Sequence, residues 1–251
     1  MTSQVATHAI SCIICAFNEA PRIAAVLAIV SSHPLLKEII VVDDGSTDAT
    51  AEVVRGFSSV KLIVLPVNQG KSTAMAAGLA AASNSWVMLL DADLVGLLPE
   101  DISALAAPVL AGQATISLSL RQNSLWFFRL MGMDFVTGER VIPHDLLSGQ
   151  LATMKRLPGF GIEVFMNRQI IARKLQIAVI DWAGVSQSRK TEKMGYAKGI
   201  WAEFRMVAHL LRTATPVTLL GQMLRMLFLR KRRGDQTKAD RLRLGSGPKP
   251  L

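Results

Sequence analysis

The chain has 251 residues, a formal net charge of +9, and hydrophobic side chains at half of its positions. This length suits one large domain with or without an appendage, and the composition excludes a disordered or fibrous protein. The charge is uneven, because the segment from Arg225 to the end carries nine basic and two acidic residues. The sequence therefore predicts a basic tail that acts as a binding arm. No base-stacking or groove-reading module accompanies this tail, so nucleic acid is not an expected partner.

The remaining global features favour a cytosolic protein. The first residues, MTSQVATH, contain no basic region followed by an apolar core, so a secretion signal is not expected. Cys12 and Cys15 lie three apart in one predicted strand, where their side chains point to opposite faces. We therefore expect two reduced thiols and no disulfide between them.

The first 120 residues alternate between short apolar runs and helical stretches. The runs are rich in Val and Ile, as in parallel strands buried on both faces. This alternation predicts an α/β, Rossmann-like doubly wound and mostly parallel sheet. The expected strands and helices are, in order, Ala9–Ala16, Pro21–Ser31, Ile39–Val42, Asp48–Phe57, Val60–Leu65, Lys71–Ala82 and Trp86–Leu90. Pro21 favours a helix start, and Thr47 or Asp48 is the expected N-cap of the second helix.

The pattern continues less regularly in the rest of the chain. A helix is expected after Pro99-Glu100-Asp101, followed by a strand over Ala114–Leu120 and an aromatic-rich segment over Trp126–Phe135. A helix near Ile162–Lys174 and a strand over Gln176–Asp181 follow. No repeat or long linker divides this region.

Three of the predicted strands end in polar clusters. These clusters are Cys15-Ala16-Phe17-Asn18-Glu19, Asp43-Asp44-Gly45-Ser46 and Asp91-Ala92-Asp93. Any one of these clusters alone could be an ordinary turn, since Asp, Asn, Gly and Ser form turns. Ligands of doubly wound sheets bind beyond the carboxyl ends of the strands, so three clusters at this edge indicate a pocket.

The spacing of Asp91 and Asp93 indicates a metal site. In extended backbone alternate residues point the same way, so both carboxylates would face one ion. Carboxylate oxygens suit Mg²⁺ or Mn²⁺, which proteins bind with one or two carboxylates and substrate phosphates. Lys71 follows Gly70 at the start of a predicted helix, where free amides and a cation favour an anion.

These motifs resemble, in order and spacing, those of family-2 glycosyltransferases with the GT-A fold. The similarity is strong over residues 9–121 and includes Cys15–Glu19, Val41–Asp48, Asn68–Ala74 and Asp91–Asp101. The nearest likeness is to dolichyl- or polyprenyl-phosphate sugar synthases and related bacterial enzymes. The resemblance implies inverting sugar transfer from a nucleotide diphosphate sugar. It also implies roles for seven residues: the nucleoside would be held by Phe17, Glu19, Asp43 and Asp44, with Lys71 nearby, and metal and diphosphate by Asp91 and Asp93.

The acceptor half carries weaker family elements. Thr137-Gly138-Glu139-Arg140 is similar to a Ser-Gly-x-Arg element and is preferred to Leu147–Gln150, which lacks the arginine. By this resemblance Arg140 would contact the diphosphate through its planar guanidinium, although a surface ion pair is an alternative role.

Glu163 follows a Gly-x-Gly element and is the candidate general base. A hydroxyl acceptor needs one, whereas a lipid phosphate is already an anion, so the direct catalytic role of Glu163 is left open.

The late segment after Val185 departs from the family pattern. Gln187 stands where relatives often have a metal-binding His, and Val95 stands where a Gln is found. Metal coordination is therefore expected to rest on Asp91, Asp93, donor phosphates and water. Arg189 and Lys190 are further expected diphosphate contacts, or else members of a solvated loop.

The C-terminal stretch is apolar and basic. Helices are expected over Ile200–Leu211 and Pro216–Leu229, and four basic residues follow the second. Polar residues interrupt the apolar run before it reaches the length of a transmembrane span. A membrane-interfacial helix attracted to anionic lipids is therefore preferred to a core-packing one. We therefore divide the chain into a glycosyltransferase domain over residues 1–199, with donor and acceptor halves at 9–121 and 122–199, and a helical basic extension over 200–251.

The sequence thus predicts a metal-dependent inverting glycosyltransferase, peripheral to the cytoplasmic face of the membrane. It would move a hexose from a UDP- or GDP-sugar to a lipid-linked, polyprenyl-phosphate acceptor. One alternative is transfer to a soluble phosphorylated acid. Another is a catalytically silent membrane-associated protein that binds nucleotide sugars. The sequence does not specify the oligomeric state.

Overall fold

The computed structural model describes residues 9–157, 161–187 and 215–231. Its main feature is a seven-stranded sheet with the strand order β3-β2-β1-β4-β7-β6-β8. The strands, including a separate β5–β9 pair, are β1 (Ile10–Ala16), β2 (Leu36–Asp43), β3 (Val60–Val64), β4 (Trp86–Asp91), β5 (Leu94–Val95), β6 (Ile116–Arg121), β7 (Arg140–Pro143), β8 (Ile177–Trp182) and β9 (Ser186–Gln187).

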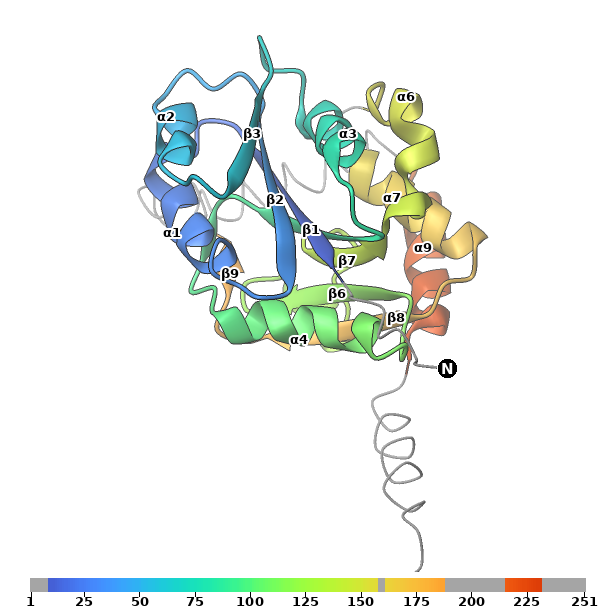
Figure 1. The fold of residues 1–251 in the computed structure, drawn as a ribbon. Helices are drawn as coiled ribbons and strands as arrows, with labels where there is room; N and C mark the ends of the chain where they lie inside the picture. Colours follow the sequence, from blue (N-terminus) through green and yellow to red (C-terminus); the bar gives the residue numbers. More distant parts are fainter. Residues whose placement is uncertain (1–8, 158–160, 188–214, 232–251) are drawn as a thin grey trace, which may run out of the picture.

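Helices connect the strands and cover both faces of the sheet (Figure 1). The α-helices are α1 (Ala20–Val30), α2 (Thr50–Arg55), α3 (Lys71–Ala81), α4 (Pro99–Leu110), α5 (Trp126–Met131), α6 (Leu151–Met154), α7 (Gly161–Ala172) and α9 (Pro216–Leu229). Two short 3₁₀ turns, η1 (His144–Leu146) and η2 (Ser148–Gln150), precede α6. The predicted α/β order is therefore confirmed, with element ends displaced by a few residues.

The sheet is parallel except for β7, which pairs antiparallel with both β4 and β6. The sequence pattern did not predict this four-residue strand. Its direction has a consequence for the site, because the start of β7 lies at the edge where the parallel strands end. Residues 137–140 are thereby brought beside the ends of β4 and β6.

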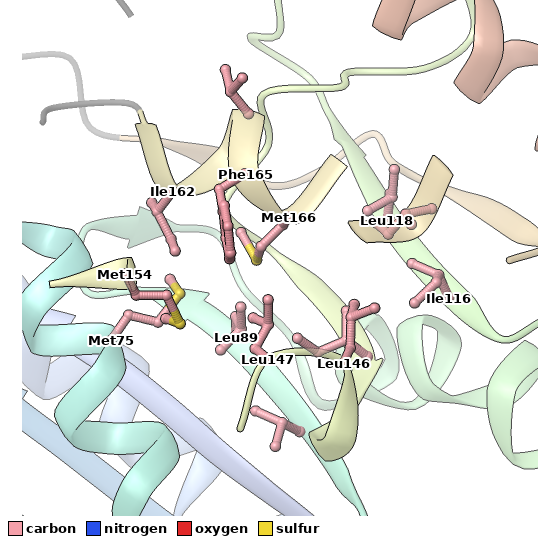
Figure 2. Close-up of a cluster of buried hydrophobic side chains, with 14 of the residues drawn as sticks. Met75, Leu89, Ile116, Leu118, Leu146, Leu147, Met154, Ile162, Phe165 and Met166 are labelled. Atoms are coloured by element: carbon pink, nitrogen blue, oxygen red, sulfur yellow. The ribbon is translucent and has the colours of Figure 1, made fainter. Parts of the chain in front are cut away.

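The core has two parts, one on each face of the sheet. Helices α1, α2 and α4 bury residues such as Leu27, Val54 and Leu105 in one cluster. Helices α3, α6, α7 and α9 contribute to the other cluster. Figure 2 shows Ile162, Phe165 and Met166 of α7 pointing toward Leu89, Leu146 and Leu147, with Met75 and Met154 beside them. This packing fixes α7 over the sheet and so places Glu163.

Cys12 and Cys15 are free thiols on opposite faces of β1, as expected. Burial raises the pKa of Cys12 far above its ordinary value, and burial also raises the pKa of Cys15 to about 12. Both side chains therefore stay protonated at neutral pH.

The predicted N-cap of the second helix is wrong. The N-cap position is Ala49, and no side chain caps the helix. Asp48 instead accepts hydrogen bonds from the backbone amides of Thr50 at 3.0 Å and Ala20 at 3.2 Å. Its carboxylate therefore joins the start of α2 to the start of α1.

Helix α9 packs on α7 along one face. Leu219 and Met226 are buried in the core, and Gln222 Nε2 donates to the carbonyl oxygen of Val164 at 3.3 Å. The alternative of a core-packing helix is thus realised on this face, while the opposite face is exposed. Within the described ranges no helix has both the length and the hydropathy to cross a bilayer. The expected helix over Ile200–Leu211 and the proposed boundary at residue 199 lie outside the described residues.

Candidate active site

The polar clusters predicted at three strand ends meet at one edge of the sheet. In register, Ala16 of β1 lies beside Asp43 of β2, and Cys15 lies beside Asp91 of β4. Parallel pairing places the carboxyl ends of these strands together. The antiparallel strand β7 adds Glu139, the residue immediately before it, to the same edge.

The turns after β1 and β2 are fastened to each other. Asn18 adopts the left-handed conformation with φ 56°, and its Oδ1 accepts from the backbone amide of Thr47 at 2.8 Å. The backbone amide of Asn18 donates to Ser46 Oγ at 2.9 Å. Asp43 Oδ1 accepts from both the amide and the hydroxyl of Ser46. The stretch Val41–Asp48 is therefore a tight turn and also one wall of the site.

Gly45 and Asp44 hold the turn after β2 against the segment that leads into α3. A Cβ on Gly45, which has φ +70°, would lie 2.5 Å from the backbone carbon of Val67, so no larger residue fits. The two oxygens of Asp44 each accept one backbone amide, from Gln69 and Gly70, at 2.8 Å. Asp44 thus joins β2 to the start of α3. Its predicted contact with a nucleoside stays a prediction.

Phe17 and Glu19 follow the end of β1. Phe17 is exposed, whereas the Glu19 carboxylate is largely covered and pairs with Arg22 Nε at 2.5 Å. The charge of Glu19 contributes to raising the pKa of Asp93, which puts the two carboxylates in one electrostatic neighbourhood.

Lys71 links Asp91, one of the two candidate metal ligands, to Glu163, the candidate base. Its Nζ lies 2.8 Å from Asp91 Oδ1 and 3.2 Å from Glu163 Oε1. Burial by itself would lower the pKa of Lys71, but the two carboxylates outweigh burial and raise that pKa. Burial would likewise raise the pKa of Asp91, yet Lys71 and Arg121 hold it below its ordinary value. The result is a charged triad contributed by β4, α3 and α7, in which both carboxylates are largely covered and the lysine side chain is partly exposed.

Glu163 is itself almost completely buried. Only its Oε1 reaches Lys71, and its Oε2 is a buried oxygen without a hydrogen-bond partner among the described residues. An unpaired buried carboxylate oxygen is costly, so it is a place where a substrate proton donor would be favoured.

Asp91 and Asp93 converge because a turn brings them together, and not through the extended backbone that was expected. Asp91 ends β4, and Ala92 and Asp93 form a turn, with the Ala92 side chain buried in the core. The turn leads into β5, which pairs with β9 and so places Gln187 opposite Leu94. Gln187 Nε2 donates to Asp91 Oδ2 at 3.2 Å and to Asp93 Oδ1 at 3.0 Å.

This convergence fits a divalent cation. The two carboxylate oxygens approach a single amide nitrogen, which therefore lies where a positive charge would be favoured. Burial, followed by the charge of Asp91, raises the pKa of Asp93 to about 6. A cation would relieve that repulsion. Within the described ranges no group of three or more His, Cys, Asp or Glu side chains is arranged to hold a metal, so donor oxygens or water would have to complete the coordination.

Arg121 and Glu139 are site residues whose roles the sequence analysis missed. Arg121 Nη1 lies 2.7 Å from Gln187 Oε1, 3.2 Å from Glu139 Oε1 and 4.0 Å from Asp91 Oδ2. Glu139 is fully buried, and burial raises its pKa although Arg121 opposes this. Because Arg121 follows directly on a predicted strand, the same strand-end argument that found Asp91 applies to it. Arg121 links the metal motif to the turn before β7.

Gly138 permits the close approach of that turn to the metal motif. A Cβ on Gly138 would lie 2.6 Å from Asp91 Oδ1 and 2.8 Å from Oδ2. The Thr137–Arg140 element is therefore in the site, as preferred. Its rival Leu147–Gln150 lies instead in the turns before α6.

Arg140 differs from expectation in its partners. It is fully buried, donating through Nη1 to Asn167 Oδ1 at 3.3 Å and through Nη2 to the carbonyl of Thr137. These bonds join the turn before β7 to α7 and exclude the alternative role of a surface ion pair. A contact between Arg140 and a diphosphate stays a prediction. Arg189 and Lys190 lie outside the described residues.

Curated proteins similar to this chain make several kinds of glycan or glycoside. It is 41% identical over 91 residues to the poly-β-1,6-N-acetyl-D-glucosamine synthase of Staphylococcus epidermidis, covering 34% of this chain and 22% of that protein. It is 34% identical over 118 residues to the glucosyl-3-phosphoglycerate synthase of Mycobacterium tuberculosis, covering 43% of this chain and 36% of the other. It is 30% identical over 123 residues to the dodecaprenyl-phosphate galacturonate synthase of Rhizobium johnstonii, covering 45% and 36%. The matched segment thus spans well under half of each relative.

Solved structures agree on the fold. The Mycobacterium tuberculosis glucosyl-3-phosphoglycerate synthase, in a complex with Mn²⁺ and UDP-glucose, superposes with a TM-score of 0.64 at 24% identity. The superposition covers 82% of this chain and 79% of that one. The GT-A fold expected from the sequence is thereby supported for the α/β part of the chain.

A model of glycosyl transferase family 2 matches residues 11–145. That match contains the strand ends with Asp43, Asp44, Asp91 and Asp93, together with Lys71 and the turn before β7. The match therefore includes the aspartate pair and Lys71, while Glu163 and Gln187 lie beyond it. Because the match covers more than half of the chain, the chain belongs to glycosyl transferase family 2.

Proposed function

We propose that this protein is a metal-dependent inverting glycosyltransferase that takes a hexose from a UDP- or GDP-sugar. The observation that carries the proposal is the convergence of Asp91 and Asp93 on one point beside Lys71. A pair of acids with a lysine beside them, at the ends of parallel strands, is suited to a diphosphate and its counterion.

The donor would bind with its nucleoside toward the turns after β1 and β2. Phe17 is exposed there and offers an aromatic face. Glu19, and the buried carboxylates of Asp43 and Asp44, would accept ribose or base hydrogens through the lone pairs that their bonds within the protein leave free. The backbone bonds of Asp44 keep this wall rigid before donor arrives. Arg140, Arg189 and Lys190 are further proposed contacts for the diphosphate.

The diphosphate would lie beside Lys71 and the aspartate pair, Asp91 and Asp93. Mg²⁺ or Mn²⁺ held by this pair would neutralise the charge that develops on the leaving diphosphate. Lys71 already carries its charge inside the site and would add a second cation without reorganisation. Gln187 would have to withdraw its amide from the aspartate pair.

In the transfer step the acceptor oxygen forms a bond to the anomeric carbon while the bond to the diphosphate breaks. The nucleoside diphosphate leaves with the electron pair, and the anomeric configuration inverts. A hydroxyl acceptor must also lose its proton, for which the unpaired Oε2 of Glu163 is available. A lipid phosphate would attack as an anion, leaving Glu163 to position Lys71.

The preferred acceptor is a lipid-linked polyprenyl phosphate, and the enzyme would work peripherally on the cytoplasmic face of the membrane. The names of the relatives divide between dodecaprenyl-phosphate and 3-phosphoglycerate acceptors. A soluble phosphorylated acid is therefore the second candidate. The fully assembled charged triad speaks against a catalytically silent binding protein.

A donor screen tests the first half of the proposal. UDP- and GDP-sugars are added with Mn²⁺ or with EDTA, and the melting temperature is followed. We expect one nucleotide class to stabilise the wild type only with the metal, and Asp93→Asn to lose that stabilisation. Equal stabilisation of both proteins in EDTA would contradict the metal role of the aspartate pair.

An acceptor comparison with Glu163→Gln tests the second half. The preferred donor is supplied with a polyprenyl phosphate or with 3-phosphoglycerate, and sugar transfer is measured. With a lipid-phosphate acceptor the variant should retain most of its turnover, because no proton is removed. With a hydroxyl acceptor we expect a loss of about 10²- to 10⁴-fold. Transfer to neither acceptor by the wild type would contradict both assignments.

A further inference from the structure

Helices α5 and α9 present most of the exposed large hydrophobic side chains of the described residues. Six of the eleven such side chains lie on these two helices. They form what we call the α5–α9 apolar surface: Trp126, Leu130, Val217, Leu220, Leu224 and Phe228. Exposed apolar side chains gathered in this way on a protein surface mark a binding surface.

The spacing on α9 is that of one helical stripe. Val217, Leu220, Leu224 and Phe228 follow one another at three- and four-residue intervals, and Val217 and Phe228 are 81% and 88% exposed. The buried side chains of α9 occupy the opposite stripe and pack on α7. The helix is therefore apolar on both faces, and only one of them packs against other described residues.

Helix α5 carries two further exposed apolar side chains. Trp126 and Leu130, one helical turn apart, are 76% and 79% exposed. Arg230 Nη1 donates to the carbonyl oxygens of Met131 at 2.8 Å and Gly132 at 2.9 Å, which joins the end of α9 to the end of α5. The C-terminal ends of the two helices thus lie together although they are far apart in the sequence.

The charges beside this surface have one sign. Residues 122–133, which include α5, and the described residues 215–231, which include α9, contain no acidic residue. Arg129 and Arg225 are exposed on the two helices, and Arg230 and Lys231 follow α9. The sequence beyond residue 231 adds six basic and two acidic residues.

We propose that the α5–α9 apolar surface docks on an anionic lipid bilayer, with Trp126 and Phe228 entering the headgroup region. Apolar side chains rimmed by Arg and Lys, with an aromatic at the boundary, have the composition of interfacial membrane helices. A protein partner would be expected to add complementary acids against the basic rim, whereas a bilayer supplies a continuous anionic plane. The contact is formed by two helices of the folded body and is not confined to the basic tail.

This docking would also orient the active site, a consequence that rests on the proposed function. Helix α9 packs on α7, which carries Glu163, and Arg129 Nη1 donates to the carbonyl oxygen of Arg121 at 2.8 Å. Both docking helices are therefore directly attached to elements that hold the charged groups of the site. A lipid-linked phosphate would be presented to the site from the bilayer.

The test is binding of the full chain to vesicles, which requires no catalytic activity. Vesicles of phosphatidylglycerol and phosphatidylcholine are compared with vesicles of phosphatidylcholine alone, using the wild type and Leu220→Glu/Phe228→Glu. We expect the wild type to cosediment with the anionic vesicles and the double variant to bind at least about tenfold more weakly. Val64→Glu, at a half-exposed valine of the edge strand β3, is the matched control and should bind as the wild type does.

A second measurement avoids substitutions that add charge. Brominated lipids quench tryptophan fluorescence on contact, and Trp126→Phe should remove a large part of the quenching seen with the wild type. Equal binding by the double variant and the wild type, or unchanged quenching in Trp126→Phe, would overturn the proposal. So would a concentration-dependent dimer that only the double variant abolishes, because a second copy would then be the occupant. Donor stabilisation by UDP- or GDP-sugars should be the same in all these variants, which separates this result from a failure of the proposed function.

Discussion

Replacing Asp93 by Asn should stabilise the metal-free protein, and the gain should depend on pH. Burial and the neighbouring charge of Asp91 raise the pKa of Asp93 from 3.8 to about 6. Below pH 3.8 the carboxyl is protonated in both folded and unfolded chains and contributes no difference. As the pH rises from there to about 6, the unfolded chain gains stability by ionising first, so the folded state is progressively penalised. Above that range the penalty is constant.

The size of the penalty follows from the shift. Two pKa units correspond to ~3 kcal/mol, and partial exposure of the side chain reduces this to about 1.5 kcal/mol. For a chain of this length that is ~3–6 °C in melting temperature. Because Asn preserves the shape and the oxygen that accepts from Gln187, little else should change. At pH 4.5 only about a third of the full difference should appear.

Urea denaturation in EDTA between pH 4.5 and 8 measures the effect. The exposed Asp181 at the end of β8 provides the control, since Asp181→Asn should show no such pH-dependent gain. Adding Mn²⁺ at pH 8 should stabilise the wild type and leave Asp93→Asn unchanged. A stability difference that is absent, or the same at every pH, would refute the view that Asp93 is held in the site at an electrostatic cost.

Two further predictions concern the packing around Asp91. Gly138→Ala would place a Cβ 2.6 Å from Asp91 Oδ1, so it should weaken Mn²⁺ binding by at least about tenfold in calorimetry. The control is Gly149→Ala, whose added Cβ meets no atom within 4 Å and which should bind Mn²⁺ as the wild type does. Equal Mn²⁺ affinities of Gly138→Ala and the wild type would refute the steric role of Gly138. Lys71→Met would leave the carboxylates of Asp91 and Glu163 without their cation, at a cost of about 2–3 kcal/mol at pH 7 by urea denaturation. Without Lys71, burial acts to raise the pKa of Asp91, so this carboxyl can take up a proton in the folded variant. The loss should therefore shrink as the pH falls toward 4, and a loss that grows on acidification would contradict the ion-pair argument.

The sequence predicted the site best where chemistry and strand pattern coincide. Asp91 and Asp93 follow an apolar run, and parallel strands end at one edge, so their place could be inferred without the fold. Lys71 was placed by the glycine before it. Asp44 was expected to face a ligand, yet its two oxygens are used by the amides of Gln69 and Gly70, and no local pattern signals such a pairing.

Other parts depended on tertiary contacts that no periodicity encodes. Strand β7 has four residues, and its antiparallel direction, which places Glu139 in the site, cannot be read from so short a run. Gln187 reaches the aspartate pair only because the two-residue strands β5 and β9 pair across ninety residues of sequence. The exposed stripe of α9 is visible in the sequence, but its junction with α5 depends on Arg230.

Release of nucleoside diphosphate tests the central claim most directly. The wild type, Asp93→Asn and Asp181→Asn are incubated with the donor selected by thermal shift and a polyprenyl phosphate, with Mn²⁺ or with EDTA. We predict release by the wild type and Asp181→Asn with Mn²⁺, none in EDTA, and a rate at least about 100-fold lower for Asp93→Asn. Equal release by Asp93→Asn, or release by the wild type that persists in EDTA, would contradict a metal-dependent transfer at the aspartate pair.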